Sequence, residues 1–217
     1  ACDERSAFGG IVACNRIVDL ATVEAMEAAA QADLIIAPGY EHGAIDRLKA
    51  KRKNTRILTA PLPDGKGLLV RQLSDGYLVQ DPYSFTATPD DWEVVTDRQP
   101  TAEERFDAEM AWRVCGHVTS NAIVMAKDGV AWGIGAGQQN RVESSELAAQ
   151  KADGRAKGGA CASDAFFPFP DGIDAAALAG AAVVIQPGGS VNDKAVIEAA
   201  DRHGMAMIFT GERQFRH

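Results

Sequence analysis

The residues best suited to chemistry begin with a glycine-rich segment, GIGAG at residues 133–137, which runs directly into QQNR at residues 138–141. Glycines at a turn between a strand and a helix let the backbone pass close to another group. Arg141 at the start of the expected helix can hold a phosphate or a carboxylate with two parallel N–H groups. The alternative is a solvated arginine, although a cation is electrostatically disfavoured in the first turn of a helix. Arg141 is therefore a candidate anion-binding residue.

A second turn of this kind, QPGGS at residues 186–190, follows an apolar strand and opens a helix. The free backbone N–H groups and the dipole of a helix N-terminus favour an anion. The segment matches neither the P-loop pattern nor G-x-G-x-x-G, so a tight turn between strand and helix is an equally open interpretation.

Residues 165–172 read AFFPFPDG and hold three of the eight phenylalanines of the chain. Two prolines exclude regular secondary structure here. One interpretation is a rigid hydrophobic plug. The other is a wall for a flat heteroaromatic ligand, with Asp171 available to bond its ring nitrogens.

Other common catalytic groups are absent from the sequence. The cysteines (Cys2, Cys14, Cys115, Cys161) contain no C-x-x-C pair, and the histidines (His42, His117, His203, His217) have no partner at metal-ligand spacing. There is no G-x-S-x-G nucleophile motif. The sequence predicts no metal site and no disulfide framework, and free cysteines are typical of a reducing cytoplasm.

The formal net charge of −8 argues against nucleic acid as a partner, because the chain lacks a long run of basic residues. The short basic cluster at residues 49–56 is interpreted as a solvated helix end. The most apolar stretch, residues 175–185, is too short to span a bilayer, so no membrane partner is expected.

The elements that would position these residues alternate between strand and helix. Strands are expected at residues 7–13, 34–37 and 56–60, with helices at 19–32 and 43–51, and Ser74-Asp75-Gly76 predicts a hairpin between residues 68–73 and 77–80. Residues 81–104 lack periodicity and are expected to connect two subdomains. Beyond them we expect helices at 101–118, from 138, at 173–178 and at 192–203, and strands at 122–126, 159–163, 181–185 and 205–209. The strand at 122–126 is expected to be followed by a loop that ends in residues 133–137. This pattern predicts a mixed sheet in an α/β fold.

Eight sequence blocks, in order along the chain, resemble the bifunctional AICAR transformylase/IMP cyclohydrolase family. They are SAFGG (6–10), IAPG (36–39), KRKN (51–54), SNAIV (120–124), GIGAGQQ (133–139), SDAFFPF (163–169), QPGGS (186–190) and FRH (215–217). The resemblance implies a cytidine-deaminase-like three-layer α/β/α fold with a mixed sheet and no zinc. It implies formyl transfer from 10-formyltetrahydrofolate, as co-substrate, to 5-aminoimidazole-4-carboxamide ribonucleotide (AICAR) in purine (IMP) biosynthesis. A cytoplasmic homodimer with shared active sites is also implied.

The resemblance assigns roles to particular residues. Asn121 would lie beside the reacting amine as the catalytic residue. The AICAR site would comprise Gly9, Asp33, Asn121 and Arg141, with Arg141 on the phosphate. The folate site would comprise Val142, Phe166, Phe169, Asp171, Ser190, Val191 and Arg213, with the two phenylalanines facing the pterin.

The chain also departs from the family pattern. The Lys-His pair that would deprotonate the amine belongs before Ala1 in the family order, as does the cyclohydrolase domain. We therefore expect the chain to represent the C-terminal part of the transformylase, with residues 1–80 and 105–217 as parts of its two subdomains. Alternatives are a nucleotide- and folate-binding module without turnover, or a proteolytic core. Gly116 and Thr119 stand where basic residues are expected near Asn121.

Overall fold

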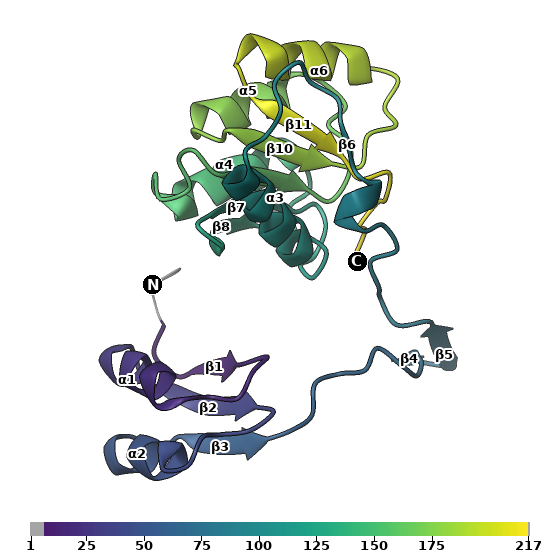
Figure 1. Cartoon of the computed structure of the whole chain (residues 1–217). Coiled ribbons are helices and arrows are strands. Elements are labelled where there is room, and N and C mark those ends of the chain that lie inside the picture. The colour runs from purple at the N-terminus through teal and green to yellow at the C-terminus, as the bar shows by residue number, and fades with distance from the viewer. Residues whose placement is uncertain (1–6, 217) are drawn as a thin grey trace. The chain divides into compact units, whose positions relative to one another are not determined.

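The computed structural model describes residues 7–216, and the chain divides between Ser84 and Phe85 into two compact units. Each unit has its own sheet with its own helices (Figure 1). Cys2, Ser6 and His217 lie outside the described residues.

Residues 7–60 of the first unit form a parallel sheet of three strands in the order β1-β2-β3, with two helices in the connections. The elements are β1 (Gly10–Ala13), α1 (Leu20–Ala28), β2 (Ala32–Ala37), α2 (Ala44–Lys51) and β3 (Arg56–Thr59). Buried apolar residues of α1, β2 and α2 make the core, among them Val23, Ile35 and Leu48. The predicted alternation of strand and helix is confirmed for this segment.

Helix α1 ends at Ala28, so the prediction that it continues to residue 32 is wrong. The Arg52 guanidinium donates hydrogen bonds to the carbonyl oxygens of Met26, Ala29 and Ala30. A cation that caps the last carbonyls of a helix stabilises its end. Arg52 is only 7% exposed, so the interpretation of the basic cluster as a solvated helix end is wrong for this residue.

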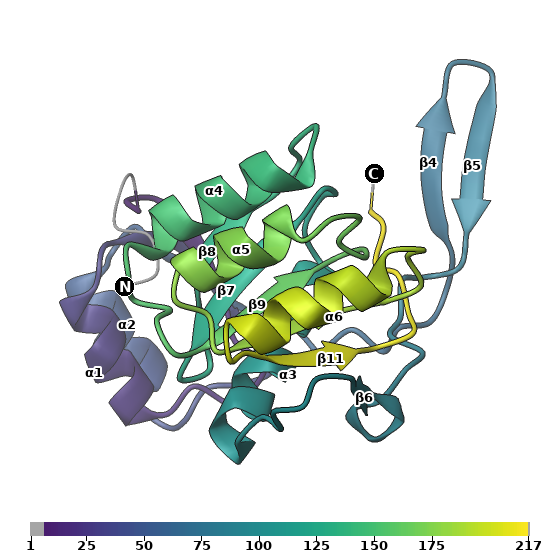
Figure 2. The same ribbon diagram turned by 90° about the horizontal axis from the view of Figure 1, so that it is seen from above.

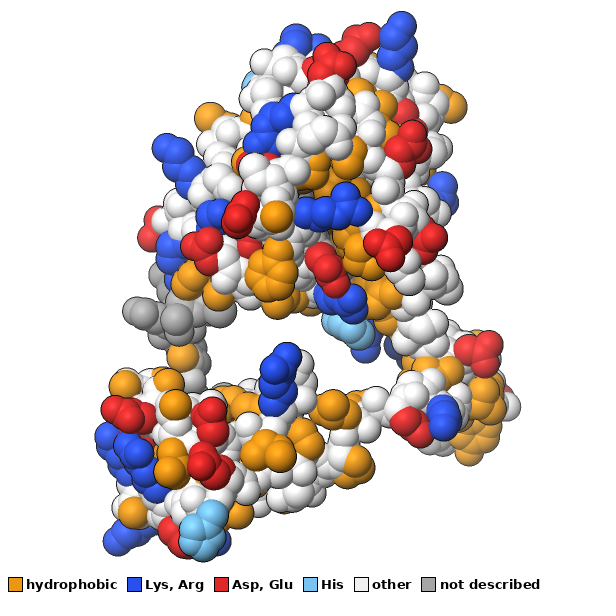
Figure 3. Space-filling model, in the orientation of Figure 1, with side chains coloured by type: hydrophobic (Ala, Val, Ile, Leu, Met, Phe, Trp, Pro, Cys, Tyr) orange, Lys and Arg blue, Asp and Glu red, His pale blue; other side chains and the backbone are white. Residues whose placement is uncertain are grey.

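The predicted hairpin is confirmed: β4 (Leu69–Leu73) pairs antiparallel with β5 (Gly76–Gln80). Every residue of both strands is exposed. Leu69, Val70, Leu78 and Val79 are among its exposed apolar residues. Apolar side chains are visible on the hairpin, next to charged ones, in the space-filling view (Figure 3).

Residues 85–216 form a mixed sheet of six strands in the order β6-β11-β10-β9-β7-β8. Strands β9, β10 and β11 are parallel to one another, whereas β6 and β7 run antiparallel to their neighbours. The strands are β6 (Glu93–Val94), β7 (Ile123–Lys127), β8 (Val130–Gly135), β9 (Ala160–Ser163), β10 (Val183–Gln186) and β11 (Ala206–Phe209).

Helices cover both faces of this sheet. Helices α4 (Arg141–Ala152), α5 (Asp171–Leu178) and α6 (Asp193–Arg202) pack on one face, and α3 (Ala102–Cys115) packs on the other (Figure 2). Successive strand residues alternate between the two cores, as Ile123 and Val124 do on β7. The prediction of an α/β fold with a mixed sheet is confirmed.

Residues 85–104, which the sequence predicts as part of a connecting segment, belong to this second unit. They contain the short helix η1 (Pro89–Asp91) and β6, which pairs with β11. The Glu212 carboxylate accepts hydrogen bonds from the backbone N–H and hydroxyl of Thr86, each at 2.7 Å, and from the N–H of Ala87 at 3.2 Å. The first and last segments of the unit are therefore joined.

The prediction of a loop that ends in residues 133–137 is wrong for β8 (Val130–Gly135), which includes Gly133 and Gly135. Strands β7 and β8 form a hairpin whose turn residues, Asp128 and Gly129, have φ of 54° and 72°. An Asp-Gly pair is a strong hairpin signal, so the sequence contained the information needed to predict this hairpin. The two glycines let α4 approach β8: a Cβ on Gly133 would lie 1.9 Å from the Ala148 carbonyl oxygen, and one on Gly135 would lie 1.9 Å from that of Ser144.

Among the described residues, no helix is both long enough and apolar enough to cross a bilayer.

Candidate functional site

The candidate site of the second unit lies at one edge of its sheet. The carboxyl ends of β9, β10 and β11 share this edge because the three strands are parallel. Strand β7 is antiparallel to β9, so β7 begins at this edge: its first residue, Ile123, pairs with Ser163, the last residue of β9. Ile123 also pairs with Gly135, so β8 ends at the same edge. We call this the carboxyl edge; it comprises residues 120–122, 136–142, 164–172, 187–192 and 210–216. Ligands of open α/β sheets bind beyond the carboxyl ends of strands.

The structure brings together at this edge every predicted site residue of the second unit. These residues are Asn121, Arg141, Val142, Phe166, Phe169, Asp171, Ser190, Val191 and Arg213.

Arg141, the first residue of α4, is held by an ion pair inside the unit. Its Nη2 lies 2.7 Å from Oδ1 of Asp164, and its Nε donates to Oγ of Ser163 at 2.9 Å. The Asp164 side chain is fully buried, and its Oδ2 accepts the backbone N–H of Ala122 at 3.1 Å. Arg141 retains 15% exposure, and within residues 7–216 no hydrogen bond from its Nη1 is found. The guanidinium is thus oriented by a buried carboxylate and keeps one nitrogen for a ligand.

Asn121 immediately precedes β7, and its side-chain amide has a fixed orientation. Its Nδ2 donates to the Gln138 carbonyl oxygen at 3.0 Å, and the backbone N–H of Asn121 reaches the same oxygen at 3.3 Å. The Ser144 hydroxyl donates to the Asn121 carbonyl oxygen at 2.8 Å. The Nδ2 hydrogen bond fixes the orientation of the side chain, and the other end of the amide, Oδ1, can accept a hydrogen bond from a ligand.

The phenylalanines of residues 165–172 differ in burial, so the hydrophobic-plug interpretation fits one ring, and the ligand-wall interpretation stays a prediction for the other two. Phe167 is 1% exposed, and its N–H donates to Oε1 of the buried Gln186 at 2.7 Å, so this ring is the predicted hydrophobic plug. Phe169 is 58% exposed and Phe166 is half-buried. The Arg213 guanidinium lies over the Phe166 ring, 5.2 Å from its centroid, and forms a cation–π pair.

Two N–H groups of the turn at residues 186–190 are bound by a side chain of the same unit. The Asp193 carboxylate accepts the N–H of Gly189 at 2.7 Å and that of Ser190 at 3.1 Å. A carboxylate in this position competes with an external anion, which favours the tight-turn interpretation. Nδ2 of Asn192 donates to the Pro168 carbonyl oxygen at 2.9 Å, which joins this turn to the phenylalanine-rich segment. Val191 is fully exposed beside it.

Gly9 and Asp33 belong to the first unit, where they are neighbours. Gly9 has φ of 82°, its N–H donates to the Gln31 carbonyl oxygen at 2.8 Å, and a Cβ at this position would lie 3.5 Å from Oδ2 of Asp33. The positive φ explains a glycine here.

The sequence analysis missed Asp164 and Gln186 as functional candidates. Both are fully buried polar residues at or next to the carboxyl end of an apolar strand. A charged or amide side chain that directly follows an apolar strand was the available signal. Gln214 was also missed; its side-chain nitrogen and oxygen are both buried, and neither has a hydrogen-bond partner among residues 7–216.

The structure contains no group of three or more His, Cys, Asp or Glu side chains placed to hold a metal among residues 7–216. Burial raises the pKa of the Cys161 thiol to about 12. Burial, with a contribution from the Asp164 carboxylate, also raises the pKa of Cys115 well above its ordinary value.

We therefore expect Cys115 and Cys161 to resist alkylation by iodoacetamide at about pH 8, because the thiolate is the reactive form. Half-buried Cys14 serves as the internal control and should be modified in the folded protein. Peptide mass spectrometry before and after unfolding in urea measures all three sites. Rapid modification of Cys161 in the folded chain would contradict its burial.

An α/β chain with a mixed sheet and a polar, aromatic carboxyl edge is the class that these observations define. Residues 1–151 match the AICARFT/IMPCHase bienzyme family, and the chain belongs to this family. It is 51% identical to the bifunctional purine biosynthesis protein PurH of Dinoroseobacter shibae, with all of this chain and 43% of that protein aligned. PurH of Roseobacter denitrificans is 47% identical, again over 100% of this chain and 43% of the relative. PurH of Chlorobium phaeobacteroides is 47% identical over 99% of this chain and 41% of the relative. The chain thus spans less than half the length of these relatives.

Proposed function

We propose that this chain acts in purine biosynthesis by contributing to formyl transfer from 10-formyltetrahydrofolate to the exocyclic amine of AICAR. The observation that carries the proposal is the meeting of Asn121, Arg141 and the Phe166–Arg213 pair at one carboxyl edge. The family model and the PurH relatives support purine biosynthesis as the setting.

Arg141 would bind the phosphate of AICAR. Its Nη1 is available, and the Asp164 carboxylate holds the guanidinium in place. A preoriented guanidinium loses little freedom on binding an anion. Gly9 and Asp33 are proposed as further AICAR-binding residues.

Asn121 would orient the AICAR amine for attack on the formyl carbon. Its Oδ1 can accept a hydrogen bond from the amine N–H, and the bond from Nδ2 to the Gln138 carbonyl oxygen holds the side chain in place. Holding the nucleophile in the reactive orientation lowers the entropic part of the barrier. A weakly basic amine also requires a general base, and the resemblance assigns that role to a Lys-His pair outside this sequence.

The folate would occupy the aromatic end of the carboxyl edge. Phe166 and Phe169 offer ring surface to the pterin, and Arg213 can pair with a carboxylate of the folate tail. Val142, Asp171, Ser190 and Val191 are the remaining proposed lining residues. We also propose the cytidine-deaminase-like fold, the cytoplasmic location and the homodimer with shared sites. Residues 1–80 and 105–217 are proposed as parts of the two transformylase subdomains, with residues 85–104 added to the second because they belong to the second unit.

Isothermal titration of the chain with AICAR and with 10-formyltetrahydrofolate tests the proposed sites directly. Formyl transfer is then assayed by chromatography, with the chain alone and with the added segment of a PurH relative that carries the Lys-His pair. Product in the second mixture supports a formyltransferase. Binding without product in either mixture supports the non-catalytic alternative, and binding of neither ligand overturns the proposal.

Arg213→Gln is expected to weaken folate binding about tenfold, the loss expected for one hydrogen bond to a charged group. AICAR affinity and the unfolding midpoint should stay unchanged, because the Arg213 side chain is exposed. The matched control is Arg202→Gln, which removes another exposed arginine of the same unit, on α6. Equal losses in the two variants would show that only overall charge matters.

A further inference from the structure

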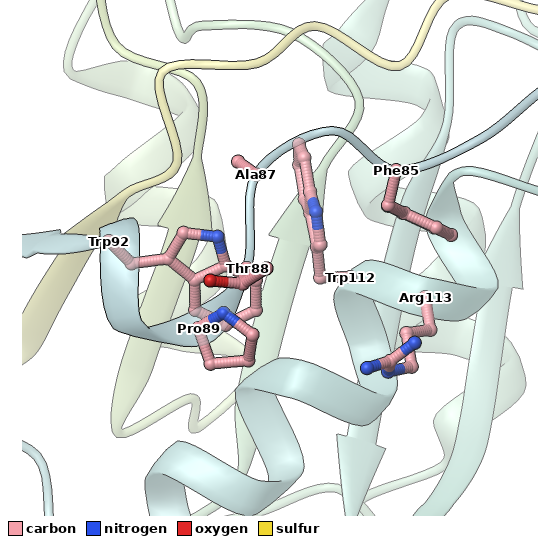
Figure 4. Close-up of a pocket in the computed structure, with 7 residues that line it drawn as sticks. All are labelled: Phe85, Ala87, Thr88, Pro89, Trp92, Trp112 and Arg113. Carbon is pink, nitrogen blue, oxygen red and sulfur yellow. The ribbon is translucent and has the colours of Figure 1, made fainter.

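A cavity of about 150 Å³ lies in the second unit, between α3 and the segment that precedes β6. The aromatic side chains of Phe85, Trp92 and Trp112 form part of its wall (Figure 4). Its lining residues are Phe85, Ala87, Thr88, Pro89, Trp92, Trp112 and Arg113. None of them is among the residues proposed to bind AICAR or folate.

Two hydrogen-bond donors in this wall lack an acceptor. The indole N–H groups of Trp92 and Trp112 are buried, and neither has a hydrogen-bond partner among residues 7–216. The whole side chains are also buried, with residue exposures of 8% and 1%. In Figure 4 the nitrogen of Trp92 lies on the ring edge turned toward Ala87 and Trp112.

Trp132 provides the contrast, because its indole N–H donates to the Lys127 carbonyl oxygen at 3.1 Å. A buried N–H without an acceptor costs free energy, and such groups in proteins are nearly always paired. Two of them in the wall of one cavity therefore call for an occupant that brings acceptor atoms.

The size and charge of the cavity restrict that occupant. An apolar protein cavity of about 150 Å³ accommodates one benzene ring. Arg113 adds a positive charge to the lining; its side chain is 56% exposed and pairs with Glu109 at 2.7 Å. No lining residue is acidic. Donor N–H groups and a guanidinium favour an anionic acceptor and disfavour a cation.

We propose that this cavity binds a planar, single-ring aromatic carboxylate, whose ring lies among Phe85, Trp92 and Trp112. The carboxylate oxygens accept the indole N–H groups and face Arg113. No lining residue belongs to the carboxyl edge, although Glu212 of that edge accepts the backbone N–H of Ala87, and the proposal does not depend on the proposed formyl transfer.

Benzoate is the probe, and the three indole N–H resonances of the full chain, labelled with ¹⁵N at tryptophan, are the readout. Benzoate should shift the signals of Trp92 and Trp112 in a saturable manner and leave that of Trp132 in place. Benzylamine, a cation of similar size, should shift none of them. Absence of a shift with benzoate, or equal shifts of all three signals, overturns the proposal and leaves ordered water as the occupant.

Two variants test separately whether binding needs the indole N–H donors and whether it needs the volume of the cavity. Trp92→Phe removes one N–H and keeps an aromatic ring, and it should weaken benzoate binding about tenfold. Ala87→Leu keeps both donors but fills the cavity, so binding should be lost. The control Trp132→Phe should bind benzoate as the parent chain does. Unchanged benzoate binding in Ala87→Leu would place the ligand elsewhere, even if Trp92→Phe failed to fold.

Discussion

Replacing Asp164 by Ala is expected to lower the free energy of unfolding by about 3–5 kcal/mol, the cost of removing one partner of a buried ion pair. The Asp164 side chain is fully buried, and its two oxygens accept hydrogen bonds from Arg141 and from the N–H of Ala122. The variant leaves the Arg141 guanidinium without its counter-charge in a site where only 15% of that side chain is exposed.

Urea denaturation of the parent chain and of Asp164→Ala measures the difference in their free energies of unfolding. The matched control is Glu109→Ala, which breaks the exposed ion pair with Arg113 on α3. Pairs of that kind contribute about 0.2–1 kcal/mol. If Asp164→Ala were no more destabilising than Glu109→Ala, the buried pair would not hold the carboxyl edge together. AICAR binding to Asp164→Ala should also weaken, because Arg141 loses the group that orients it.

Gly135→Ala should destabilise the second unit by about 3 kcal/mol, the upper end of the usual cost of overpacking. The added Cβ would lie 1.9 Å from the carbonyl oxygen of Ser144 and 2.7 Å from its carbonyl carbon. These are backbone atoms of α4 and cannot turn away as a side chain does. The helix must move off β8, and Arg141 at its N-terminus must move with it.

Thermal unfolding and AICAR titration test this prediction together. Gly76→Ala is the control: Gly76 begins the exposed strand β5, and no atom lies within 4 Å of the added Cβ. The control should leave the unfolding temperature nearly unchanged. A stable Gly135→Ala variant with normal AICAR affinity would mean that α4 can shift without disturbing the site.

Much of the fold could be predicted from the sequence, because apolar runs alternate with amphipathic ones and glycines mark the turns. The hairpin at Ser74-Asp75-Gly76 is confirmed in this way, and so is the expected start of the first helix near residue 19, where the Asp19 carboxylate accepts the Thr22 N–H at 2.7 Å. Strand β8 was missed because glycines lower the expectation of a strand. At Gly133 and Gly135 the close approach of α4 outweighs that preference.

The candidate site was less accessible to sequence reasoning. Arg141 was found from its place at a helix start, but its partner Asp164 comes from a segment that was interpreted only through its phenylalanines. Pairing across the sheet brings the two together, and a single sequence does not contain that register. The Asp193 carboxylate accepts the N–H groups of Gly189 and Ser190, and these hydrogen bonds could not be predicted either. A single sequence does not distinguish a helix N-terminus with free N–H groups from one whose N–H groups are bound by a side chain.

Residues 85–97 contact the last strand of the second unit, and this affects how the unit folds during synthesis. Strand β6 pairs only with β11, and Thr86 and Ala87 are bound by Glu212. On the ribosome, a segment that emerges early must therefore wait for more than a hundred residues before its partner exists. Contacts of such sequence separation form slowly. Until β11 emerges, Trp92 lacks the apolar residues Ala206 and Ile208 with which it shares a core cluster, so this is the stage of synthesis at which the unit most needs protection from aggregation.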